Sequence, residues 1–254
     1  MLLQTALSLA LIVVIPVLLI YVLALLEPFA VTRLKWIAVS AAWGALSYGV
    51  AAVIQGAERD AQTYALSITL VSAPFLEEAL KLAFLLFLYN RTLARYSGDA
   101  LVYGFAVGSG FAILESAAYA FGQADPNFGG VLTRIVSTGL FHASLSAIMV
   151  AAVGGVLYRR RWLSYPFFAV IYLFAVILHH LFNIYALLEA VVGDVQTAIF
   201  IGLSSLFIVL GLQYFNRARE RQRIVREAAP ALEAVEQLVV RRGSALLTAL
   251  EGQV

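Results

Sequence analysis

The chain has 254 residues, of which 62% are hydrophobic and only 13% are charged, and its mean hydropathy is +0.90. Roughly a quarter of the residues of a soluble domain carry charge, so this composition excludes a soluble globular protein. The formal net charge of +2 gives no case for nucleic-acid binding, and the absence of cysteine excludes disulfides and a cysteine nucleophile.

Seven apolar stretches are long enough to cross a bilayer as helices, which takes about 20 residues each. They lie near residues 2–26, 36–54, 63–89, 100–122, 134–157, 163–189 and 195–214. Their hydrophobicity is continuous rather than alternating, which favours helices over the strands of a barrel. We therefore predict an all-α, polytopic transmembrane bundle over residues 1–214. The first stretch follows no Lys or Arg and carries no cleavage pattern, so we expect a retained span.

Lysine and arginine gather on alternate connections between these stretches. Those after the first, third, fifth and seventh stretches hold Arg33, Lys35, Arg91, Arg95, Arg159, Arg160, Arg161, Arg217, Arg219, Arg221, Arg223 and Arg226, whereas the others hold Arg59 and Arg134. The positive-inside rule therefore predicts an N-terminus outside the cytoplasm and a cytoplasmic C-terminus.

Residues 215–254 differ in composition from the rest of the chain. An Arg-rich segment is followed, beyond Pro230, by apolar residues at helical spacing, namely Leu232, Val235, Leu238, Val239, Leu246 and Leu250. Proline suits the first turn of a helix. We expect a cytoplasmic amphipathic helix that rests on lipid or on the bundle, with partner binding as the alternative.

Ionisable and amide side chains interrupt four consecutive apolar stretches. They are Glu77, Glu78 and Lys81 in the third, Glu115 in the fourth, His142 in the fifth, and His179, His180 and Asn183 in the sixth. A charge at the centre of a membrane helix costs roughly 2.5–3.5 kcal/mol on insertion, so these groups are expected to face inward and share partners. A structural ion pair that fixes the register of two helices would explain one pair of these charges. It does not explain why four stretches each contribute an ionisable group.

The segment "SAPFLEEALKLAF" carries the densest charge. On a helix Glu77 and Lys81 share one face, whereas Glu78 is rotated from Glu77 by about 100°, so one carboxylate can pair with the ammonium while the other points elsewhere. Pro74 should kink or break the helix where the carboxylates begin. Counted from the outer ends of the stretches, the ionisable groups lie roughly 10–20 Å deep, and we expect them to line one outward-opening cavity.

Buried carboxylates, histidines and an amide suit metal-free hydrolysis of a peptide bond. A carboxylate away from bulk water is a good general base toward a water molecule, and His and Asn can donate to an oxyanion. Signatures of other intramembrane proteases are missing: the sequence has no His-Glu-x-x-His zinc motif. The segment Gly108-Ser109-Gly110 lacks the preceding Gly of the rhomboid motif, and Gly193-Asp194 lacks the earlier Gly of the presenilin motif.

The ordered set resembles the PrsW-like family of intramembrane proteases, which belongs with the CAAX-type prenyl-protein proteases in a glutamic-protease superfamily. It consists of Glu77-Glu78-Ala79-Leu80-Lys81, Phe111 with Glu115, His142 in "LFHASLS", and His179 with Asn183, over about residues 63–190. The resemblance implies a multi-span protease that makes the first, extracytoplasmic cut in a membrane-bound anti-sigma factor. We expect such a substrate and the lipid bilayer as partners, no cofactor, and a bacterial or archaeal cytoplasmic membrane.

Roles for individual residues also follow from the resemblance. It implies that Glu77 is the base that activates water and that His179 and Asn183 hold the oxyanion. Glu78 and Lys81 complete the first motif, with Lys81 as the partner in a structural ion pair.

The remaining residues depart from the CAAX-type pattern or have no counterpart in it. Glu115 stands where CAAX-type relatives have His, so His142 is the candidate for the missing water-activating partner. We interpret His180 as structural.

Three alternatives stay open. The superfamily includes a scaffold subunit of the presenilin complex, so a non-catalytic assembly factor is one of them. A proton-coupled transporter would also place Glu, Lys and His in the membrane, although the sequence shows no inverted repeat. A zinc site is the third, whose ligands would be Glu115, His142 and His179, whereas the resemblance implies a metal-free mechanism.

Overall fold

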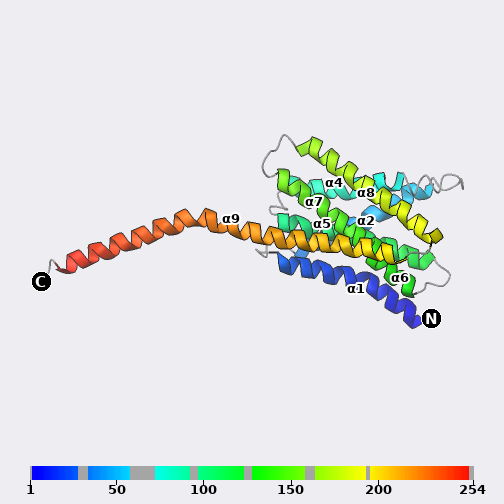
Figure 1. The fold of residues 1–254 in the computed structure, drawn as a ribbon, viewed down its shortest axis with the longest axis horizontal. Helices are drawn as coiled ribbons and strands as arrows, with labels where there is room; N and C mark the ends of the chain where they lie inside the picture. The colour runs from blue at the N-terminus through cyan, green and yellow to red at the C-terminus, as the bar shows by residue number, and fades with distance from the viewer. Residues whose placement is uncertain are drawn as a thin grey trace.

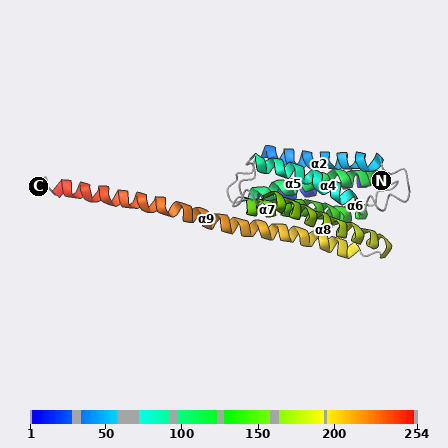
Figure 2. The ribbon, with the colours of Figure 1, turned by 90° about the horizontal axis from the view of Figure 1, so that it is seen from above.

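The computed structural model describes residues 2–27, 34–57, 72–91, 97–122, 128–157, 164–192 and 195–251. In chain order its helices are α1 Leu2–Leu26, α2 Leu34–Ala57, α4 Ala73–Asn90, α5 Ser97–Gly122, α6 Phe128–Arg134, the π-helical η2 Ile135–Gly139, α7 Leu140–Leu157, α8 Ser164–Val192 and α9 Val195–Glu251. No strand occurs in the described ranges, and the helices lie side by side along one direction (Figures 1 and 2). The predicted all-α bundle is confirmed.

Six helical segments are long and apolar enough to cross a membrane, in α1, α2, α5, α6 to α7, α8 and α9. The protein is therefore a multi-pass membrane protein. The third predicted stretch supplies α4, whose 18 residues include Glu77, Glu78 and Lys81 and so are less apolar than the six. In Figures 1 and 2 α4 nevertheless lies along the same direction as its neighbours, and it packs against α2 and α8.

The orientation of the bundle in the membrane stays a prediction. Among the residues that support it, Arg33, Arg95, Arg159, Arg160 and Arg161 lie outside the described residues, as do Arg59 on the opposite side and residues 63–71 of the third predicted stretch. Pro74 lies in the first turn of α4, where its missing N–H leaves no helical hydrogen bond unmade. The described part of α4 thus begins one turn before the two carboxylates.

Helices α5 and α7 form the centre of the bundle, and every residue of α5 from 98 to 112 is buried. Glycines allow the two helices to approach closely. A side chain on Gly104 would overlap the backbone of Ser146, and one on Gly108 would overlap the carbonyl oxygen of His142. Small residues at such crossings permit backbone contact in membrane bundles. The backbone position of His142 is therefore set by α5.

We expect Gly108→Ala to lower the melting temperature in detergent, because the added methyl group must push α7 away from α5. Overpacking of this kind costs about 1–3 kcal/mol. Gly49→Ala is the matched control, since Gly49 is also helical and has open space at its Cβ position. Its melting temperature should stay at or slightly above that of wild type. Equal melting temperatures for the two variants would contradict the close packing.

Helix α9 runs without a break from Val195 to Glu251, through Tyr214 and with Pro230 in its interior. The expectation that a helix begins at Pro230 is therefore wrong. The residues before it are mostly Arg, Glu, Gln and Ala, which are good helix formers, so the helix of the last span simply continues. Figure 1 shows the C-terminal part of α9 extending beyond the bundle, and its residues Leu232 and Val235 are exposed. It does not rest on the bundle.

Candidate active site

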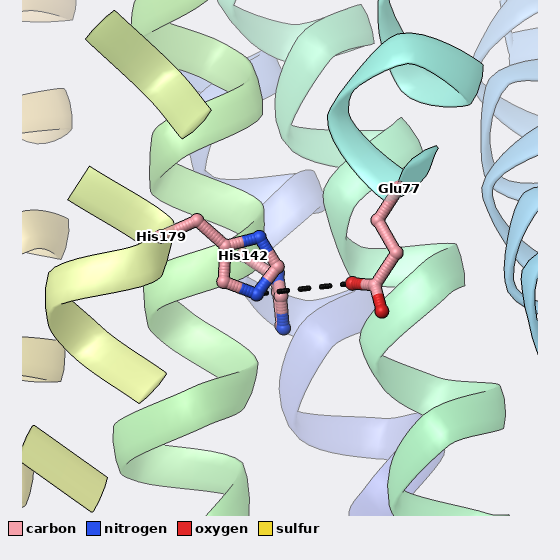
Figure 3. Close-up of side chains that lie close together, drawn as sticks. All are labelled: Glu77, His142 and His179. Atoms are coloured by element: carbon pink, nitrogen blue, oxygen red, sulfur yellow. Dashed lines mark ion pairs between the residues drawn. The ribbon is translucent and has the colours of Figure 1, made fainter. Parts of the chain in front are cut away.

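Four helices bring six of the predicted residues together. Helix α4 contributes Glu77, Glu78 and Lys81, α5 contributes Glu115, α7 contributes His142 and α8 contributes His179. All except Glu115 are buried, and the side chains of Glu77, His142 and His179 face one another in Figure 3. Polar neighbours from other helices lower the free-energy cost of burying these charged side chains within the membrane.

Lys81 lies at the centre of this cluster, with none of its side chain exposed. Its Nζ is 2.8 Å from Glu78 Oε1 and 3.0 Å from His142 Nδ1. It also lies 4.0 Å from the centroid of the Phe111 ring, close enough for a cation–π interaction. The ion pair of α4 therefore joins Lys81 to Glu78, three residues before it. Glu77 is left for another role.

His179 is held by the carboxylate of Glu78. Its Nδ1 lies 2.8 Å from Glu78 Oε1, and its Nε2 lies 3.8 Å from Glu77 Oε2. The rings of His142 and His179 meet edge to face, with centroids 4.7 Å apart. A single carboxylate oxygen of Glu78 thus accepts from an ammonium on its own helix and an imidazole on α8. This arrangement makes Glu78 a structural anchor for the site.

Glu77 is bound less firmly than its neighbour. Gln55 of α2, a residue that the sequence analysis missed, places its Nε2 3.5 Å from Glu77 Oε1. The other oxygen, Oε2, is buried and has no hydrogen-bond partner among the described residues. It faces His179 Nε2 across a distance that one bridging water can span. Glu77 Oε2 and His179 Nε2 can therefore hold a reactive water between them.

Glu115 is held by α6 and α7 together. Arg134 Nη2 lies 2.8 Å from its Oε1, and His142 Nε2 lies 3.3 Å from its Oε2. Arg134 and His142 are eight residues apart, and in a regular α-helix their side chains would differ in direction by about 80° around the helix axis. A π turn takes up one extra residue, which reduces this difference to about 20°. The π-helical turn at Ile135–Gly139 supplies that residue. Arg134 was expected in a connection between spans, whereas it is the last residue of α6 and its side chain reaches Glu115.

Two further residues are located by helix register alone. Asn183 lies one turn beyond His179 on α8 and is half-buried. His180 follows His179 directly and is also half-buried. The described contacts assign no catalytic role to either, and the predicted role of Asn183 at the oxyanion stays a prediction.

The possibility of a metal ion is tested by the donor atoms present. Glu77, His142 and His179 each offer one ligand atom, and these atoms lie within 4.8 Å of one another. Two histidines and a glutamate are a common ligand set of catalytic zinc, and a carboxylate such as Glu78 often orients a zinc-bound histidine. The set differs from the expected one, because Glu115 pairs with Arg134 and Glu77 takes its place.

His142 does not fit the role of a metal ligand in this arrangement. Lys81 is a donor only, so its contact makes His142 Nδ1 the acceptor and puts the proton of the neutral ring on Nε2. A ligating nitrogen needs a free lone pair, and the opposite ring nitrogen normally donates to an acceptor. The described residues therefore supply two ligands, Glu77 and His179, instead of the three that a catalytic zinc site uses.

The fold and the cluster define a multi-pass membrane protein in which carboxylates and imidazoles converge between helices. Comparison with protein families gives a match to the PrsW family intramembrane metalloproteases over residues 32–212. This match spans more than half of the chain and includes the whole cluster, so the protein belongs to the PrsW family and is an intramembrane peptidase. Searches of curated proteins and of solved structures gave no match.

Proposed function

We propose that the protein is an endopeptidase that hydrolyses a peptide bond of a single-span membrane protein, with Glu77 as the general base. One observation carries this assignment. Of the three carboxylates in the cluster, Glu78 pairs with Lys81 and Glu115 with Arg134. Among the described residues, Glu77 has no lysine or arginine within ion-pair distance, and its buried Oε2 makes no hydrogen bond. A base must keep such a lone pair for its water.

The chemistry follows from this free carboxylate. Glu77 takes a proton from water as the water oxygen attacks the peptide carbonyl, a contribution worth roughly 10²–10⁴-fold in rate. The oxyanion that forms needs an N–H donor, which His142 on α7 and Asn183 on α8 can supply. Glu77 then returns the proton to the nitrogen of the leaving amine. A buried site keeps bulk water away from these groups and strengthens their interactions.

A membrane-spanning substrate suits the position of the cluster. Three of the six residues lie on α5, α7 and α8, which are long and apolar enough to cross a membrane. A substrate that itself spans the membrane can bring its scissile bond to a site between such helices. The resemblance to PrsW-like proteases supports an anti-sigma factor as the substrate and a first cut on the extracytoplasmic side. Candidate substrates are tested by co-expression with the wild-type chain and with Glu77→Gln. A substrate is a membrane protein that is shortened only in the wild-type cells.

We expect cleavage to survive exhaustive chelation, and elemental analysis to find less than one zinc per chain, because His142 is not arranged as a ligand. A zinc protease treated in parallel should lose its activity and so prove that chelation was complete. Loss of cleavage that zinc restores would contradict the proposal. It would make Glu77, His142 and His179 the ligands, in agreement with the description of the family as metalloproteases.

A further inference from the structure

The contacts of Lys81 and Glu78 determine where two imidazole protons lie. An ammonium has only donors, and an ionised carboxylate has only acceptors. Lys81 Nζ contacts both Glu78 Oε1 and His142 Nδ1, and Glu78 Oε1 also contacts His179 Nδ1. His142 Nδ1 must therefore accept, whereas His179 Nδ1 must donate. All four side chains are buried, so water does not compete for these contacts.

We propose that Lys81 and Glu78 are positioning residues that together fix the two histidines in opposite tautomers: Lys81 donates to His142 Nδ1, and Glu78 accepts from His179 Nδ1. A neutral imidazole carries one proton, so His142 bears it on Nε2 and His179 bears it on Nδ1. The Nε2 atoms of the two rings then differ in kind. That of His142 is an N–H donor, and that of His179 is a lone-pair acceptor. One buried ion pair, Lys81 with Glu78, thus gives two neighbouring rings complementary functions.

These tautomers assign reaction roles, an assignment that rests on the proposed peptidase function. His179 Nε2 and Glu77 Oε2, 3.8 Å apart, accept the two hydrogens of one water. His142 Nε2–H has only a long contact of 3.3 Å to Glu115 Oε2, and an oxyanion at hydrogen-bond distance can replace that oxygen as its acceptor. The oxyanion donor is then His142, whereas the sequence resemblance implied His179 together with Asn183.

The step balances without an oxidant or a metal. The water oxygen forms a bond to the carbonyl carbon, the π electron pair moves to the carbonyl oxygen, and Glu77 takes one water proton. His142 Nε2–H donates to the resulting oxyanion. The carbonyl then re-forms as the carbon–nitrogen bond breaks, and the proton on Glu77 passes to the amine. His179 keeps its own proton on Nδ1 throughout, where Glu78 holds it.

Solid-state NMR of the full-length protein in bilayers, labelled with nitrogen-15 histidine, tests the proposal directly. The chain has only three histidines, and His180→Gln and His142→Gln assign their signals. We expect His142 protonated at Nε2 and His179 protonated at Nδ1. The same tautomer in both rings, or a proton on Nδ1 of His142, would overturn the proposal. The spectrum reports on protons whether or not the protein cleaves a peptide, so it can fail independently of the proposed function.

A double variant tests the cause of the tautomers. Glu78→Gln with Lys81→Met removes the ammonium without leaving an unpaired carboxylate, and the Gln side-chain oxygen still accepts from His179. We expect the His142 signal to change to the other tautomer or to a mixture, while that of His179 stays as in wild type. An unchanged His142 signal would show that Lys81 does not set its proton. Should this variant fail to fold, the wild-type spectrum still decides between opposite and equal tautomers.

Discussion

Replacement of Glu77 by Gln is expected to slow cleavage of a single-span substrate by roughly 10²–10⁴-fold, the usual contribution of a general base. The amide has almost the same size and can keep its contact with Gln55, but it cannot take a proton from water. Stability should stay near that of wild type, because Lys81 pairs with Glu78 and loses no partner. Initial rates with purified protein in detergent, together with melting curves, measure both effects.

The matched control applies the same substitution at an exposed carboxylate. Glu227 lies on the projecting part of α9, 62% exposed, in an ion pair with Arg223. Exposed pairs of this kind contribute only about 0.3–0.5 kcal/mol, so Glu227→Gln should keep both activity and stability. Cleavage at the wild-type rate by Glu77→Gln would show that Glu77 is not the base.

Loss of Lys81 should be the most damaging change to the folded bundle. Lys81→Ala leaves the buried carboxylate of Glu78 without its cation, and breaking a fully buried ion pair costs about 3–5 kcal/mol. We expect a low folded yield and a clearly reduced melting temperature in detergent. Lys81→Met fills more of the space and separates the loss of charge from the loss of volume.

A double-mutant cycle shows whether the damage comes from the ion pair. Glu78→Gln and Lys81→Ala together remove both charges, so the double variant should be more stable than the sum of the two single effects predicts. Additive effects would mean that the two side chains act separately. Normal yield and melting of Lys81→Ala would show that this pair does not hold the bundle together.

Continuous apolar runs were sufficient to predict the helices, because a bilayer admits few other structures. The residues of the cluster were also predictable. Charges such as Glu77 and Lys81 on one span and histidines on others must turn inward to avoid lipid, and this requirement places them together. Order along the chain did not determine the contacts within the cluster, which depend on how the helices are rotated and packed.

Three details show where the sequence was insufficient. Helix geometry allows Lys81 to pair with a carboxylate three or four residues away, and His179 from another helix favours Glu78. Arg134 was assigned to a connection, but a π turn orients its side chain toward Glu115. No sequence motif predicts this π turn. Because the pairing of Glu115 with Arg134 was not predicted, Glu115 was also expected among the zinc ligands.

Reconstitution of the purified wild-type protein with one purified single-span substrate, in vesicles that contain no other protein, shows whether this chain alone hydrolyses a peptide bond. Mass spectrometry of the products is the measurement. We predict two fragments whose masses add up to that of the substrate plus one water, and an intact substrate in vesicles with Glu77→Gln. A substrate that stays intact with the wild-type protein in every lipid composition would contradict the account. That result would favour a non-catalytic scaffold or a proton-coupled transporter.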